Sequence, residues 1–136
     1  MMEHSQIVAE GSLEAVTSIA ETIAARLPVK LLKPPAPGMV MVRHVDPLEN
    51  THFLLGEAFV TECEVEVDGL LGYGCILGGG NEHALCAALV DAVVGGGHAF
   101  AVELRPLLES EQKRIEERWN REGRAVASTR VSFEVR

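Results

Sequence analysis

Apolar and polar residues alternate most regularly in the middle of the chain. The odd positions of residues 59–68 are Phe59, Thr61, Cys63, Val65 and Val67, and the even positions from 62 onward are all acidic. Strict alternation predicts a strand with its odd positions in the core and its acids in water. Asp68-Gly69 follows at once, the pair that favours a two-residue type I′ turn. We therefore expect a hairpin whose second strand covers residues 70–77.

Three longer segments show helical spacing. Residues 13–27 place apolar side chains on one face, with Ser12 as the expected N-cap and Pro28 as the stop. Residues 82–94 are apolar on nearly every side, which predicts a helix buried by its own sheet and by something else. A helix over about residues 104–122 combines a thin apolar stripe with many charged residues, as in a solvated or interfacial helix.

Shorter elements complete the pattern. A separate helical turn is expected around Ile7 and Val8. Residues 33–38 contain three prolines, which fix φ and remove donors, so a linker or turn is expected there. Residues 39–45 and 127–135 read as strands.

Together these elements predict an α+β fold, in which an antiparallel sheet with helices packed on it forms a single domain. Its N-terminal helical segment is residues 1–27, and its sheet and remaining helices are residues 28–136.

Composition excludes several classes of function. The 136 residues are 47% hydrophobic, enough for a core, and no apolar run approaches the ~20 residues that cross a bilayer. The N-terminus lacks the basic start and apolar stretch of a signal peptide, so a cytoplasmic protein is expected. A net charge of −8 disfavours binding to nucleic acid and to anionic membranes.

The three cysteines, Cys63, Cys75 and Cys86, form no CxxC pair. Their odd number argues against a disulfide framework or a zinc site, and we expect reduced, small apolar side chains, with a reactive thiol as the alternative. The five histidines show no ligand spacing. No metal site and no cofactor are expected.

Candidate chemistry centres on Gly78-Gly79-Gly80-Asn81 at the start of the apolar helix. Free backbone N–H groups and the positive helix end could hold an anion there, which makes Gly79, Gly80 and Asn81 candidate binding residues. The loop is not a Walker A motif, because no Lys-Ser or Lys-Thr follows. The alternative is a tight turn in which Asn81 caps the helix.

His83 and Asp91 are the ionisable residues of interest in that helix. His83, in the first turn, could donate to a phosphate or relay a proton; the alternative is a structural residue or a contact with a partner. Asp91 lies two turns further on, and the rise of roughly 12 Å argues against direct contact between them. We expect a buried hydrogen-bonding role for Asp91, to a strand backbone or a partner's arginine. No hydrolase triad is supported.

One set of motifs resembles the PhnG family. Leu71-Gly72-Tyr73, then Leu77-Gly78, His83-Ala84 and Asp91-Ala92 match a family pattern of LGY-x-x-x-LG, a short polar loop, HA and a DA ending. The stretches 37–43, 56–58 and 128–133 are similar to the same family in order and spacing. The chain departs from the pattern at Gly79 and Gly80, where members carry a charged pair.

The resemblance implies a subunit of the bacterial carbon–phosphorus lyase core complex, which degrades phosphonates. PhnG proteins act with PhnH, PhnI and PhnJ. With an accessory ATPase-like protein, the G, H and I chains are implicated in displacing adenine from ATP by a phosphonate, which forms ribose 1-phosphonate 5-triphosphate. The family places the nucleosidase activity on PhnI and assigns PhnG no catalytic residue.

Three interpretations remain open. In the first, the chain is a scaffold and interface subunit of this transferase, ribose 1-methylphosphonate 5-triphosphate synthase. In the second, residues such as His83 or the glycine loop complete a shared active site; in the third, the chain is an unrelated small α+β binding protein. Self-association is also expected, because so apolar a helix should not be covered on every side by so small a domain.

Overall fold

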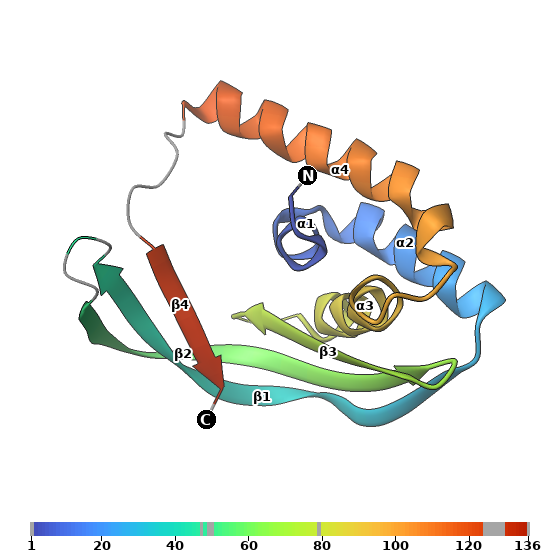
Figure 1. Ribbon diagram of the computed structural model, residues 1–136, viewed down its shortest axis with the longest axis horizontal. Coiled ribbons are helices and arrows are strands. Elements are labelled where there is room, and N and C mark those ends of the chain that lie inside the picture. The colour runs from blue at the N-terminus through green and yellow to red at the C-terminus, as the bar shows by residue number, and fades with distance from the viewer. Residues whose placement is uncertain (1, 47, 49–50, 79, 124–129, 136) are drawn as a thin grey trace.

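The computed structural model describes residues 2–46, 48, 51–78, 80–123 and 130–135. Its elements are α1 (His4–Glu10), α2 (Leu13–Arg26), β1 (Val29–Asp46), β2 (Thr51–Val67), β3 (Leu70–Leu77), α3 (Asn81–Val90), the π-helical turn η1 (Asp91–Gly95), α4 (Ala101–Glu122) and β4 (Arg130–Val135). The strands form an antiparallel sheet in the order β3-β2-β1-β4. The helices gather on one side of it (Figure 1), which confirms the α+β class.

The predicted hairpin is confirmed. β2 pairs with β3 from Val67↔Leu70 to Val60↔Leu77. Asp68 and Gly69 join them with φ values of 48° and 86°, the positive values that a type I′ turn requires. β4 pairs with residues 40–45 of β1, so the described part of the C-terminal strand returns to the same sheet as expected.

The alternation within β2 is only partly what we predicted. Cys63, Val65 and Val67 are buried, but Phe59 is 72% exposed and Glu62 only 8% exposed. The backbone N–H of Gly78 donates to the Phe59 carbonyl at 2.9 Å, so the residue opposite Phe59 is a glycine with no side chain to cover it. Glu62 is buried because other strands supply its polar partners, described below.

The prediction of a linker at residues 33–38 is wrong, because these residues belong to β1. The register between β1 and β2 shifts twice there and leaves Leu32, Pro34 and Pro35 without partners, as in a bulged strand. In the described part of the chain, β4 covers the other edge of β1 only from Val40 onward. Proline is tolerated on such an uncovered strand edge, where no ladder bond needs its missing N–H.

α3 lies directly on the sheet. A Cβ added at Gly72 would overlap the carbonyl oxygen of Ala88, and one at Gly74 would overlap that of Ala84. Gly72 of the LGY motif and Gly74, two residues further on, therefore let the helix approach the backbone of β3. α1 and α2 contact the other side of α3 (Figure 1), and α4 lies outermost.

Helices of the same chain cover the face of α3 that we expected to be free for self-association. The predicted helix is buried on most sides, as expected, but what covers it besides the sheet is the N-terminal pair α1 and α2 of the same chain. Leu85, Ala87 and Val94 remain half-buried. Self-association stays a prediction, and α3 is not the uncovered surface that we expected.

The ends of the helices follow local signals, with one exception. The Ser12 hydroxyl accepts a hydrogen bond from the Ala15 amide at 3.2 Å, so the predicted N-cap of α2 is confirmed. α3 is preceded by Gly80 as its N-cap, at φ 122°, and Asn81 is its first helical residue, so the predicted Asn81 cap is wrong. A φ in this range suits glycine, which explains why the turn into the helix uses Gly80.

α4 buries Leu104, Leu108 and Ile115, as its apolar stripe predicts, and ends at Gly123 in the left-handed conformation. Glu111, expected on a charged face, is buried with them because it lies three residues after Leu108 on the same side of the helix. No helix in the described residues is long and apolar enough to span a bilayer.

Candidate functional site

The start of α3 forms the site that the glycine loop predicts. Gly80, Asn81 and His83, with Leu13 and Glu82, line an open hollow of about 490 Å³. Gly79 lies outside the described residues. Three of the four predicted site residues are therefore brought together, next to the N-terminus of α2.

The hollow has mixed suitability for an anion. The first turn of α3 leaves backbone N–H groups free, which favours negative charge. Glu82, in the same turn, adds a carboxylate that opposes a bound anion. The site can accept a weakly charged or hydrogen-bonding group more readily than a phosphate.

The ring of His83 has a structural partner. Its Nε2 is hydrogen-bonded to the carbonyl oxygen of Val8 on α1. Because a carbonyl only accepts, Nε2 carries the proton and donates it, and a neutral ring then has only Nδ1 left, as an acceptor. A neutral His83 in this arrangement has no further proton to give to a phosphate, and its contact ties α3 to α1.

Asp91 bonds to a strand backbone as predicted, but its side chain is 38% exposed, so the prediction that it is buried is wrong. Its Oδ2 accepts the backbone N–H of Tyr73 at 2.9 Å, and its Oδ1 lies 3.1 Å from Nε2 of His4. β3 is an edge strand, so this carboxylate satisfies an amide that the sheet leaves free. The LGY and DA parts of the motif are thereby joined in space.

A second polar cluster, which sequence reasoning missed, lies on the sheet. The Tyr73 hydroxyl donates to Oε1 of Glu62 at 2.7 Å, and Nζ of Lys33 lies 3.8 Å from Oε2 of the same carboxylate. Burial, followed by the hydrogen bond to Glu62, raises the pKa of Tyr73 well above its ordinary value. The glutamate side chain lies over Gly38, where any Cβ would displace it.

Alternation could not have found this cluster, because it places every acid of β2 in water. Two residues of this cluster's surroundings lie in recognised motifs: Tyr73 in the LGY motif and Gly38 in the stretch 37–43. Neither motif indicates which acidic residue of β2 these residues contact.

The cysteines behave as small apolar residues. Burial is the largest cause that raises the pKa of Cys63, Cys75 and Cys86, so the thiolate form is disfavoured at each. All three are free thiols, and no three His, Cys, Asp or Glu side chains of the described residues gather as a metal site. These facts favour the structural interpretation over a reactive thiol.

Fold and contacts together define a small α+β protein in which His83, Asp91 and Glu62 hold its own elements together. The family model described as "Phosphonate metabolism protein PhnG" matches residues 2–136. The chain therefore belongs to the PhnG family and is a subunit of the carbon–phosphorus lyase complex of phosphonate metabolism. Among curated proteins, none matches this chain.

Proposed function

We propose that this chain is a scaffold and interface subunit of the carbon–phosphorus lyase core complex. It acts in the cytoplasm with PhnH, PhnI and PhnJ, and is needed to form ribose 1-phosphonate 5-triphosphate from ATP and a phosphonate with release of adenine. The observation that carries this proposal is the family match over residues 2–136. In this role the chain is a non-autonomous part of a transferase whose catalytic groups lie on its partners.

The roles of the ionisable side chains support a scaffold. His83 holds α3 to α1, Asp91 holds η1 to the edge strand β3, and Glu62 joins β2 to Tyr73. Each of these groups directs at least one polar atom to a partner within the chain. Its loss should therefore affect folding before chemistry.

A surface for partners is available where β3 ends. Leu77, which is 62% exposed, lines a hollow of about 620 Å³ with Val40, Val60 and Ile76 in its wall. Exposed apolar surface around such a hollow is typical of a protein–protein contact. We therefore assign this surface, named here the β3-end surface, to a partner subunit; contact with a second copy of the chain would account for self-association.

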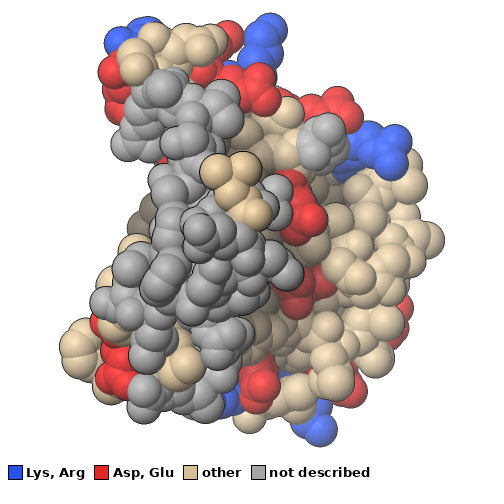
Figure 2. All heavy atoms as spheres, turned by 60° about the vertical axis from the view of Figure 1, so that its left-hand side comes forward, with Lys and Arg blue, Asp and Glu red and all other residues tan. Residues whose placement is uncertain are grey.

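The charge of the chain indicates which kind of partner its surface favours. Figure 2 looks at the end of the molecule where β1, β2 and β4 reach beyond the helices, and its coloured residues include more Asp and Glu than Lys and Arg. With a chain charge of −8, a second copy is repelled at long range. A partner with basic residues around its apolar contact is favoured.

A second candidate function is a contribution of His83 and the glycine loop to a shared active site. The observation in its favour is that Gly80, Asn81 and His83 line one open hollow. The hydrogen bond from His83 to Val8 and the carboxylate of Glu82 count against it.

Copurification tests the assembly. A tagged chain expressed with PhnH and PhnI should retain both, and Leu77→Asp should reduce that retention because it places a charge in the β3-end surface. Val102→Asp is the matched control, since Val102 is similarly exposed on α4, away from that surface. Failure of the wild-type chain to retain either subunit would contradict the proposal; equal loss with both variants would place the contact elsewhere.

A further inference from the structure

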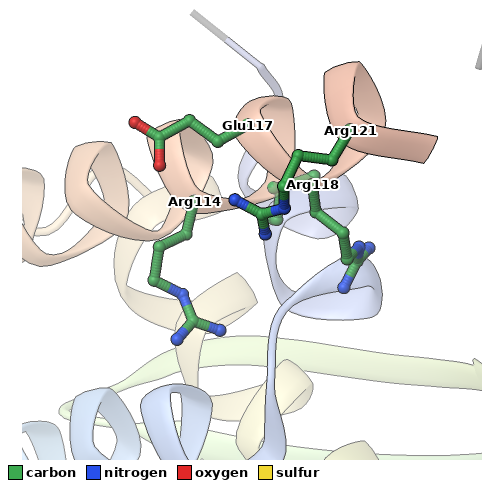
Figure 3. A pocket seen from close by; sticks show the side chains of 5 residues that line it. Arg114, Glu117, Arg118 and Arg121 are labelled. Carbon is green, nitrogen blue, oxygen red and sulfur yellow. The ribbon is translucent and has the colours of Figure 1, made fainter. Parts of the chain in front are cut away.

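The C-terminal half of α4 carries a hollow lined by arginines. Arg114, Arg118 and Arg121 follow one another at spacings of four and three, which places them on one side of the helix. With Ile115 and Glu117 they line a space of about 230 Å³ (Figure 3). Such a concentration of guanidinium groups stands out in a chain of net charge −8.

Two of the three arginines are held in place by carboxylates. Nη2 of Arg118 lies 3.1 Å from Oε2 of Glu10, and its Nη1 donates to the Glu10 carbonyl at 3.3 Å. Nε of Arg114 donates to Oε1 of the buried Glu111 at 2.9 Å. These contacts position both guanidinium groups before any ligand arrives, which lowers the entropy lost on binding.

Many donors remain after these contacts. An arginine offers five N–H donors, and Arg114 uses only its Nε in the contacts described. Within the described residues, Arg121 makes no hydrogen bond or ion pair that would use its donors. Figure 3 shows the Glu117 carboxylate directed away from the three guanidinium groups. The hollow therefore offers unused guanidinium donors, while Glu10, Glu111 and Glu117 balance the three positive charges around it.

We propose that this hollow binds a phosphate or phosphonate group. Guanidinium forks pair with the oxygens of such groups in a bidentate way, and several forks around one small space suit a compact anion with many oxygens. An acidic protein segment would need a more extended basic surface than this single hollow. The inference goes beyond the proposed function, because a scaffold needs no anion bound to this chain.

Calorimetry on the full chain at low ionic strength tests the site, with the fluorescence of its one tryptophan, Trp119, as a second readout. The probes are inorganic phosphate, methylphosphonate and tripolyphosphate. We expect saturable binding of one ion per chain. Arg121→Gln should weaken it by about tenfold, the loss of one charge-assisted contact.

The matched control is Arg105→Gln, which removes the same charge from an exposed position of α4 outside the hollow and should leave the affinity unchanged. Circular dichroism checks that both variants fold. If tripolyphosphate binds more tightly than phosphate and methylphosphonate, the hollow fits the triphosphate of a nucleotide. If all three bind equally, the hollow fits one phosphate or phosphonate group. Either result supports the site. Absence of saturable binding, or equal weakening by both variants, would overturn it.

Discussion

The backbone amide of Tyr73 donates a hydrogen bond to the carboxylate of Asp91, with 2.9 Å between N and Oδ2. The two residues are 18 positions apart, one on the edge strand β3 and the other where α3 passes into the π-helical turn. This contact joins the β2–β3 hairpin to the end of α3, and these elements carry the family's central motif. It gives Asp91 a purpose in folding that requires no substrate.

Asp91→Ala should destabilise the chain by about 1–3 kcal/mol, because the Tyr73 amide and His4 both lose their partner. Asp91→Asn is the matched control: its amide oxygen can still accept from Tyr73, so the loss should be smaller. Urea unfolding followed by circular dichroism measures both. Equal stability of Asp91→Ala and the wild type would show that the edge amide needs no cap.

Gly74→Ala should cost about 1–3 kcal/mol, the usual range for overpacking, because the added methyl group meets the backbone of α3. Leu71→Ala serves as the control on the same strand: Leu71 is 71% exposed, so its change should stay within about 0.5 kcal/mol. Thermal unfolding of the two variants compares them. A Gly74→Ala protein as stable as Leu71→Ala would contradict the close approach of α3 to β3.

Tyr73 makes stability fall at alkaline pH. Its pKa is raised in the folded chain, so above the ordinary value of about 10 the folded state keeps a proton that the unfolded state loses. The contribution is complete below about pH 10 and declines as the pH rises further. Tyr73→Phe should therefore show a shallower decline in unfolding free energy between about pH 9 and pH 11. Parallel curves for the two proteins would contradict the raised pKa.

The three thiols should react slowly while the chain is folded. Burial raises the pKa of each cysteine and limits access, so both the thiolate fraction and the collision rate are low. Ellman's reagent should modify Cys75, the least buried of the three, before Cys63 and Cys86. Unfolding in urea should make all three react fast. Rapid modification of Cys86 in the folded chain would instead revive the reactive-thiol alternative.

Local signals predicted the hairpin and the helices because each depends on neighbouring residues alone. Alternation and Asp68-Gly69 specify the turn, and Ser12 with an apolar stripe specifies α2. Local signals could not predict that the three prolines of residues 33–38 lie within a strand. Whether residues 33–38 can join a sheet depends on how far β4 extends along β1, a property of the far end of the chain.

The contacts of Glu62 and His83 could not be predicted either, because their partners lie far away in the sequence. Glu62 is indistinguishable in pattern from Glu64, and only the meeting with Tyr73 and Lys33 makes it a buried residue. His83 meets a carbonyl 75 positions away, so the sequence could name the residue without deciding between its structural and catalytic roles.

Adenine release from ATP and a phosphonate, by the reconstituted G, H and I chains with their accessory protein, tests the scaffold role most directly. Omitting this chain should abolish release. His83→Gln, which can still donate to the Val8 carbonyl, should release adenine at the wild-type rate once assembly is shown to be normal. Full activity without the chain, or loss of activity in a normally assembled His83→Gln complex, would contradict the account.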